Sequence, residues 1–181
     1  DKKIECGDAC NTVSLSLSNH LGSHVDSPQH FITNGATTES YQPDEWIFNK
    51  ILIIHLTISP AEIITVKHIE KQCYDVFDAE LVLIKTSFET FRGNREYWES
   101  APAYSPELAV FLKNRFKSFT AIGLDTLSIS SYQHRELGRD AHKAFLGNEI
   151  RIFEDLSLLQ LNKDMELTKV IALPLRFENS D

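Results

Sequence analysis

The spacing of hydrophobic residues changes along this chain, and each spacing predicts a kind of element. Residues 12–18 alternate strictly between small polar and apolar side chains, which is the period of a half-buried strand. The serines of this strand have the same parity as His20, so they either line a pocket beside that histidine or face water. Denser apolar runs predict buried strands at 50–59, 80–87 and 119–128.

Helices are predicted between these strands. Residues 65–76 carry apolar side chains at three- and four-residue spacing, which is the pattern of one helical face. A second helix is expected to begin at Ser105 and Pro106, because serine is a common cap and proline is tolerated in the first turn. Residues 138–146 predict a third, short helix that is closed by Gly147 and Asn148 and presents a histidine.

Two segments have no clear period and are predicted to be loops. Residues 32–43 are rich in Thr, Asn, Gly and Ser, and we expect them near the entrance of a site. Residues 88–104 contain several aromatic residues, among them Trp98, and are a candidate lid or subunit interface. Trp46 and Phe48 are either an aromatic wall for a substrate or part of the core or a dimer interface.

The composition indicates one ordinary globular domain, residues 1–181. The chain has 42% hydrophobic and 24% charged residues, and its length allows a substantial core. The net charge of -8 argues against nucleic acid and anionic membrane surfaces as partners. The longest apolar run, Ile51 to Ile58, is far shorter than the ~20 residues that a membrane span needs. His55 within this run is expected to be a core histidine with satisfied hydrogen bonds.

The cysteines and the first residue bear on the compartment. Cys6, Cys10 and Cys73 are odd in number and scattered, which favours free thiols in a reducing compartment over disulfides. No signal peptide is visible, and we expect a cytoplasmic protein. Because the chain begins with Asp1 rather than methionine, we also expect that a processed or disordered start is missing.

One stretch concentrates the chemistry of the chain: His20, His24, Asp26 and His30 lie within eleven positions. Helix is disfavoured there, and a bend at Gly22 in an extended chain places three donors together, with His24 and Asp26 on one face and His20 beside them. Imidazole and carboxylate without a nearby cysteine suit an open zinc, manganese or iron site. His30 could lie in the same pocket without being a ligand and move protons. The alternative is a set of ordinary surface or core histidines.

An acidic residue is expected in a second part of the site. Residues 149–156 are predicted to be extended, and Glu154 then shares a face with Ile150 and Ile152. A carboxylate on an apolar face is costly unless it is paired, and a cation would relieve that cost. The alternative is that Glu154 lies at the strand end in water.

The histidine-rich stretch resembles the signature of the cyclase-type metal-dependent hydrolases, the family that includes the bacterial kynurenine formamidases. The family pattern is His-x-Gly-Thr-His-x-Asp-x-Pro-x-His-Phe, and residues 20–31 match every fixed position except Ser23, where threonine is usual. Serine keeps the hydroxyl, so the difference is mild. The resemblance implies that three residues bind metal, His20, His24 and Asp26, and that His30 acts as the acid/base.

A second motif extends the resemblance. The family has Gly-Ile-Asp-Thr-x-Ser, then a histidine, and twelve positions after it Glu-Asn-Leu; this chain has Gly-Leu-Asp-Thr-Leu-Ser at 123–128, His142, and Glu-Asp-Leu at 154–156. The resemblance implies that His142 and Glu154 bind a second metal ion and that Asp26 bridges the two ions. Residues 171–175 look like the family's closing strand, so the similarity spans about residues 11–178.

The resemblance also implies a fold and a reaction. The expected fold is a mixed α/β domain of the swivelling β/β/α type, built on a β-barrel-like sheet with flanking helices and lacking the family's outer terminal strands. The expected reaction is hydrolysis of an amide, formamide or lactone by water activated at one or two divalent ions, with zinc or manganese as the first candidates. Relatives are commonly dimers or larger.

The substrate is the least defined part of this expectation. The best-known activity in the family is hydrolysis of N-formylkynurenine, and other relatives open cyclic amides. Ser130 stands where many members have aspartate, which favours the latter group. Two other readings predict different behaviour: a non-catalytic metal-containing module that binds a small molecule, and an acidic interaction domain that binds no stoichiometric metal.

Overall fold

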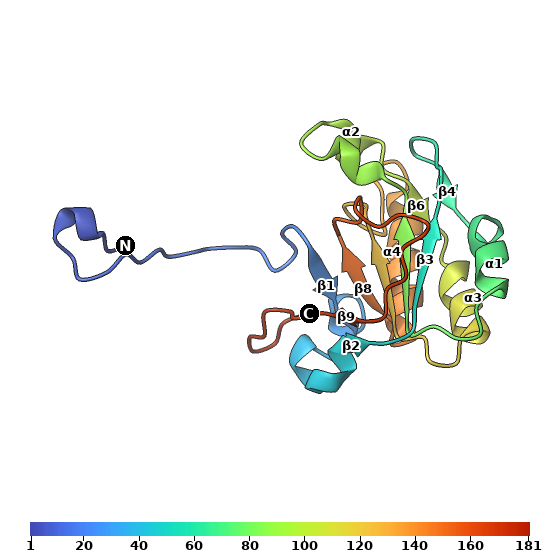
Figure 1. Ribbon diagram of the computed structural model, residues 1–181, viewed down its shortest axis with the longest axis horizontal. Helices are drawn as coiled ribbons and strands as arrows, with labels where there is room; N and C mark the ends of the chain where they lie inside the picture. The colour runs from blue at the N-terminus through green and yellow to red at the C-terminus, as the bar shows by residue number, and fades with distance from the viewer.

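The computed structural model describes residues 1–181 and is built on a five-stranded mixed sheet (Figure 1). In spatial order the strands are β1 (His24–Asp26), β8 (Arg151–Glu154), β7 (Ala121–Leu124), β5 (Leu81–Lys85) and β3 (Ile51–His55). The last four run parallel to one another, whereas β1 is antiparallel to β8. The predicted mixed α/β class is therefore confirmed, and β1 and β3 form the two edges.

Helices connect the parallel strands, as parallel pairing requires. They are α1 (Val66–Tyr74), α2 (Glu96–Glu99), α3 (Glu107–Arg115) and α4 (Arg135–Gly147). Side chains of α1, α3 and α4 share one buried apolar cluster with the central strands. Every residue of β7 is buried, which explains why its sequence is continuously apolar rather than alternating.

The opposite face of the sheet is covered by a second, smaller apolar cluster. Trp46 and Phe48 are 3% and 2% exposed in it, so they belong to the core and not to a substrate wall. The Arg151 guanidinium lies 4.8 Å from the Trp46 ring centroid and 5.4 Å from that of Phe48. Its Nη1 also donates a hydrogen bond of 2.7 Å to the carbonyl oxygen of Glu45. This hydrogen bond and the aromatic rings stabilise the buried positive charge of Arg151.

Short elements complete the chain. Two small sheets pair β2 (Ile47–Phe48) with β9 (Val170–Ile171) and β4 (Ile63–Ile64) with β6 (Ala103–Tyr104). Single 3₁₀ turns are η1 (Ile4–Cys6), η2 (Pro28–His30), η3 (Thr38–Ser40), η4 (Pro43–Trp46) and η5 (Phe88–Phe91). No helix is both long enough and apolar enough to cross a bilayer.

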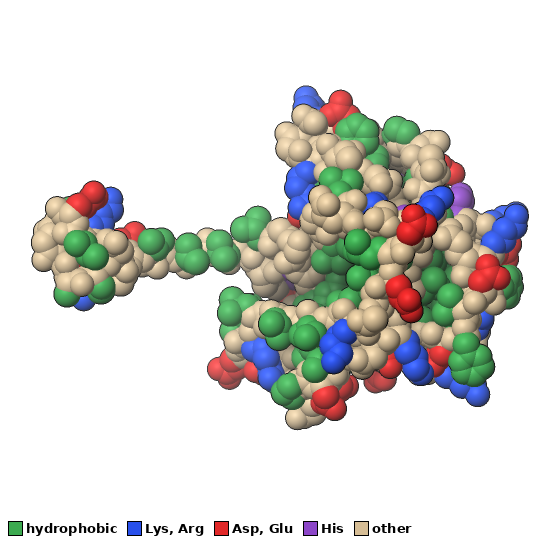
Figure 2. Space-filling model, in the orientation of Figure 1, with side chains coloured by type: hydrophobic (Ala, Val, Ile, Leu, Met, Phe, Trp, Pro, Cys, Tyr) green, Lys and Arg blue, Asp and Glu red, His purple; other side chains and the backbone are tan.

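The prediction of a strand at residues 12–18 is wrong. This segment runs away from the body as an extended arm without a neighbouring strand (Figures 1 and 2). Val13, Leu15 and Leu17 are 75%, 77% and 63% exposed, and the serines between them also face solvent. A strand needs a hydrogen-bonded neighbour, and alternation alone does not provide one.

Other boundaries differ from the prediction in smaller ways. Residues 88–104 are not one loop, because they contain η5, α2 and β6, and Tyr97 is buried among them. The third predicted helix begins earlier, at Arg135. The second helix forms as predicted, but no side-chain cap bond is made at its start. Of the predicted closing strand at 171–175, only Ile171 is in a strand, as the second residue of β9.

Candidate metal centre

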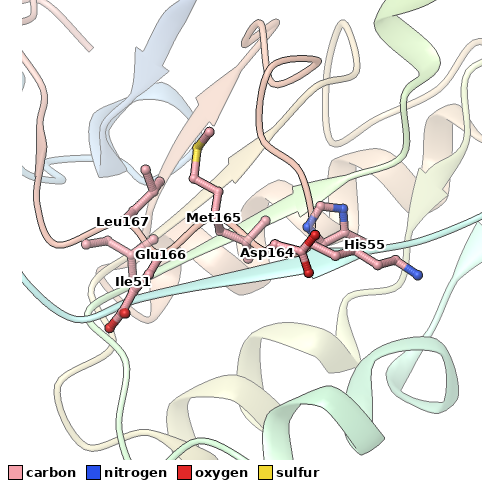
Figure 3. Close-up of a pocket in the computed structure, with 8 residues that line it drawn as sticks. Ile51, His55, Asp164, Met165, Glu166 and Leu167 are labelled. Carbon is pink, nitrogen blue, oxygen red and sulfur yellow. The ribbon is translucent and has the colours of Figure 1, made fainter.

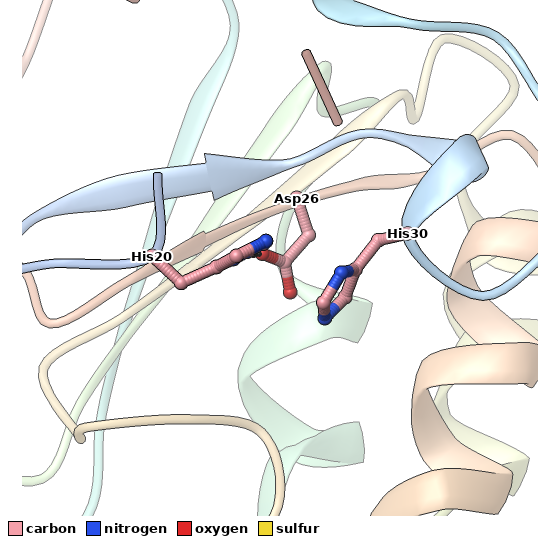
Figure 4. A group of neighbouring side chains, drawn as sticks. All are labelled: His20, Asp26 and His30. Atoms are coloured by element: carbon pink, nitrogen blue, oxygen red, sulfur yellow. Dashed lines mark ion pairs between the residues drawn. The ribbon is translucent and has the colours of Figure 1, made fainter. Parts of the chain in front are cut away.

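The predicted ligands meet around one buried carboxylate, Asp26, at the end of β1. Figure 4 shows Asp26 between His20 and His30. Gly22 has a φ of +67°, a conformation that favours glycine, and its bend returns His20 to the strand. His20 Nδ1 then lies 2.9 Å from Asp26 Oδ1, and His24 Nε2 lies 3.4 Å from the same oxygen. The predicted convergence of these three side chains is confirmed as geometry.

The downstream residues reach the same carboxylate from other elements. His142 projects from α4, and its Nε2 lies 3.4 Å from Asp26 Oδ2 and 3.5 Å from Glu154 Oε1. Glu154 ends β8 opposite His24 in the antiparallel register, and its Oε2 lies 3.5 Å from His24 Nε2. At 3% exposure, Glu154 does not lie in water at a strand end. The two oxygens of Asp26 therefore face different histidines.

Backbone carbonyls determine which nitrogen of two histidines faces the acids. His24 donates its Nδ1–H to the carbonyl oxygen of Gly22 at 2.7 Å, and His142 donates its Nδ1–H to that of Gly138 at 2.8 Å. Nε2 of each ring is thereby directed at the carboxylates. This is the arrangement in which imidazole binds a metal ion, with the second nitrogen hydrogen-bonded to orient the ring.

Neighbouring groups orient the side chains of Glu154 and His142. Ser128 Oγ and the backbone N–H of Ile129 donate to Glu154 Oε1 at 3.0 and 2.6 Å. Phe31 stacks on the His142 ring with centroids 4.4 Å apart and an interplanar angle of 14°. These contacts restrict both side chains to one orientation each.

His30 lies at the rim of this cluster. Its ring centroid is 4.1 Å from that of His20 and 5.8 Å from that of His142. His30 donates a hydrogen bond of 2.9 Å from its Nδ1–H to Oδ2 of Asp181. Its Nε2, on the other side of the ring, therefore remains available. Asp181 also lies 3.5 Å from His20 Nε2.

The electrostatics of the cluster favour positive charge at its centre. Burial pushes the pKa of His24 down, but the contacts with Asp26, the Gly22 carbonyl oxygen and Glu154 together outweigh it and raise that pKa to about 9. Burial also opposes the charged form of His142, yet Asp26 and Glu154 raise its pKa to about 10. Burial alone would raise the pKa of Asp26, whereas the contacts with His142, His20 and His24 hold it well below its usual range.

The residues present fit a divalent cation. Neither carboxylate oxygen of Asp26 has a hydrogen bond of acceptable geometry, although both are buried and imidazole nitrogens surround them. Ligand atoms of two triplets lie within 4.8 Å of one another: His20, Asp26 and His30, and His24, Asp26 and Glu154. A buried carboxylate without a hydrogen bond is costly, and an ion bound among these donors removes that cost.

The motif at residues 123–128 supplies a second buried carboxylate, Asp125. Asp125, from the 123–128 motif, is buried and accepts hydrogen bonds from the backbone N–H and hydroxyl of Thr86 and from the N–H of Ser87. Ser87 has a φ of +62°, and this left-handed turn is held by the Asp125 carboxylate. Asp125 therefore joins the carboxyl ends of β5 and β7 and touches none of the histidines.

His55 lies outside the centre. It lines a separate pocket of about 260 Å³ with Ile51, Ile53 and the segment 163–167 (Figure 3). The prediction of a satisfied core histidine is wrong, because only its backbone atoms make hydrogen bonds, with the side chain of Gln72, and the ring is partly exposed. Burial lowers its pKa, and Lys85 and Lys163 lower it further.

Two contributors to the site could not be found from local spacing. Asp181 is 151 positions from His30 in the sequence, and no motif marked it. The N–H of Ile129 belongs to backbone, which carries no signal in the side-chain pattern. Of the two groups that hydrogen-bond to Glu154, only Ser128 is indicated by the sequence, as the last residue of the 123–128 motif.

Sequence comparisons match most of this chain to known proteins. Residues 3–131 match the sequence model of the family described as "Putative cyclase". A kynurenine formamidase of Bacillus cytotoxicus is 30% identical over 179 residues, which cover 94% of this chain and 76% of that protein. One of Bordetella petrii is also 30% identical, over 173 residues, with the same shares of both chains.

Solved structures share the fold. Isatin hydrolase A from Labrenzia aggregata superposes with a TM-score of 0.74 at 22% identity, over 91% of this chain and 70% of that one. A structure described as a potential metal-dependent hydrolase with cyclase activity has a TM-score of 0.63 at 24% identity, over 86% and 70% of the two chains. At identities this low, the superpositions establish similarity of fold alone.

Proposed function

This chain belongs to the cyclase family, and we propose that it is a metal-dependent hydrolase that cleaves an amide, formamide or lactone bond. The observation that carries the proposal is the buried Asp26 carboxylate, which lacks hydrogen bonds and is surrounded by imidazole nitrogens. A hydrolase needs such an open set of N and O donors, whereas a structural zinc site is closed by four protein ligands, often cysteines.

Five side chains would hold the metal: His20, His24, Asp26, His142 and Glu154. Asp26 presents Oδ1 to His20 and His24 and Oδ2 to His142, so it suits a carboxylate shared by two ions. We propose one or two ions per chain, with zinc or manganese as the first candidates because both accept imidazole and carboxylate. When bound, such an ion supplies a Lewis acid that lowers the pKa of a water molecule to about 7 and polarises a carbonyl group.

His30 is the proposed proton carrier. Its Nδ1–H is donated to Asp181, which fixes the ring and leaves Nε2 to take a proton or to give one to the leaving nitrogen or oxygen. The ring lies beside His20 and within reach of the donor cluster without being buried in it. This placement suits a group that exchanges protons with substrate and solvent.

The relatives suggest where to look for the substrate. Kynurenine formamidases and isatin hydrolases are named for a formamide and a cyclic amide, and both reactions break a carbonyl–nitrogen bond by adding water. We propose a small molecule of one of these two classes as the substrate. We also propose that the protein acts as a homodimer or larger assembly.

The first test is metal content combined with turnover. Protein purified without added metal should contain one or two equivalents of a divalent ion and should hydrolyse N-formylkynurenine, isatin or a simple lactone in a chelator-sensitive way. Asp26→Asn should lose metal and turnover together. Asp140→Asn, an exposed aspartate on α4, is the matched control and should keep both.

The results of this test distinguish a hydrolase from a non-catalytic metal-binding module. Metal without turnover on any of these substrates would support a metal-containing binding module of the same fold instead of the hydrolase. Absence of metal after reconstitution with zinc and manganese would refute the proposed site as a whole.

A further inference from the structure

The residue after the proposed ligand Glu154 has an unusual conformation. Asp155 has a φ of +53°, in the left-handed region, and is 7% exposed. Aspartate tolerates this region better than most residues, but the conformation must still be held by its surroundings. Asp155 directly follows Glu154, the last residue of β8, so contacts that hold the Asp155 backbone also hold the strand end from which the Glu154 side chain projects.

Two side chains from the 88–99 segment hold Asp155. The Tyr97 hydroxyl donates a hydrogen bond to Asp155 Oδ1, and Arg92 Nη2 lies 2.8 Å from the same oxygen. Arg92 Nη2 also donates to the carbonyl oxygens of Asp155 and Leu156 at 3.2 and 3.3 Å. Burial and the contact with Asp155 raise the pKa of Tyr97 well above its usual value, so its hydroxyl keeps the proton that it donates.

Asp155 is also held by the histidine-rich stretch. Ser23 Oγ donates to the Asp155 carbonyl oxygen at 2.6 Å, and Ser23 directly precedes His24. The N–H of Asp155 donates to the carbonyl oxygen of Thr126 at 2.8 Å. Asp155 therefore joins the segments that carry His24 and Glu154 to the segment that carries Arg92 and Tyr97.

We infer that Arg92 and Tyr97 are positioning residues of the metal centre, acting through Asp155 on the aim of Glu154 and on the approach to His24. The inference rests on the proposed function. Removing either partner leaves a buried carboxylate short of a hydrogen bond in a left-handed turn, and the turn then relaxes. Residues that hydrogen-bond directly to metal ligands change metal affinity by roughly 10–100-fold. Arg92 and Tyr97 act one residue further out, through Asp155, so we expect an effect at the lower end of that range.

The test is titration of metal-free protein with Co²⁺, which reports both affinity and, through its visible absorption, coordination geometry. Arg92→Met and Tyr97→Phe should each weaken Co²⁺ binding by about tenfold or more and change the absorption spectrum. Arg95→Met is the matched control, because Arg95 is exposed and pairs only with Glu99 in its own segment. It should leave affinity and spectrum unchanged.

Thermal unfolding of the metal-free variants separates positioning from folding. Tyr97→Phe removes one oxygen atom and should stay folded, so it decides the question if Arg92→Met does not fold. Wild-type affinity and spectrum in folded Tyr97→Phe would overturn the inference and leave the proposed function intact. Failure of the wild-type protein to bind Co²⁺ would overturn both.

Discussion

His142 donates its Nδ1–H to the carbonyl oxygen of Gly138, one helical turn earlier in α4, across 2.8 Å. The helix itself thus supplies the group that orients the ring, and Nε2 is left facing the carboxylates of the centre. A histidine in this position needs no other residue to select its binding nitrogen.

Replacement of His142 should remove one part of the metal site. We expect His142→Ala to weaken metal binding by at least about tenfold, because one nitrogen donor is lost and Glu154 loses its neighbour. His134→Ala is the matched control: His134 precedes the same helix, and its Nε2 donates to the Ala61 carbonyl oxygen at 3.0 Å, away from the centre. Metal analysis of both variants checks this, and equal metal contents would contradict the role of His142.

Gly138 should resist substitution for a packing reason. A Cβ at this position would lie 2.0 Å from Ser130 Oγ and 2.6 Å from Ser130 Cα, so the backbone of one segment must move. We expect Gly138→Ala to lower the free energy of unfolding by about 1–3 kcal/mol. Gly147→Ala on the same helix is the control, because its Cβ would meet only Ile32 Cδ1 at 3.7 Å. Urea unfolding of the two variants should place Gly138→Ala clearly below Gly147→Ala.

His30 should separate metal binding from turnover. We expect His30→Gln to keep the metal content of the wild type and to lose about 10²–10⁴-fold in kcat, the range that proton transfer by a side chain contributes. His68→Gln is a suitable control, since His68 pairs with Glu62 outside the centre. Full turnover in His30→Gln would show that its assigned role is wrong.

Metal binding should release protons and strengthen with pH. The pKa values of about 9 for His24 and about 10 for His142 mean that both rings carry a proton at neutral pH in the metal-free chain. A metal ion must displace those protons, so its affinity should rise from pH 6 to about pH 10, the higher of the two pKa values, and then level off. Calorimetric titrations in buffers of different ionisation enthalpy should detect about two protons released at pH 7, one from each ring. Affinity that is independent of pH over this range would contradict the prediction.

The sequence alone determined the parts of the site that depend on short separations. The bend at Gly22 and the two-residue spacing of His24 and Asp26 place donors together through local backbone geometry, and the structure has both features. The helix at 66–74 and the buried strand β5 follow in the same way from hydrophobic period. The place of Glu154 on an apolar face already suggested a cation partner, whereas its meeting with His142 and the first motif was expected only because of the resemblance to a family.

Only the tertiary structure decided which distant groups meet. The arm at 12–18 has the alternation of a strand but no neighbouring strand. Glu154 is buried at the end of β8, where β1 pairs with that strand and places His24 opposite Glu154. Asp181 reaches His30 from the far end of the chain, and Asp155 is held by Arg92 and Tyr97 from another segment. Periodicity reports which face of an element is apolar, whereas pairing between distant segments depends on the free energy of the whole packed fold.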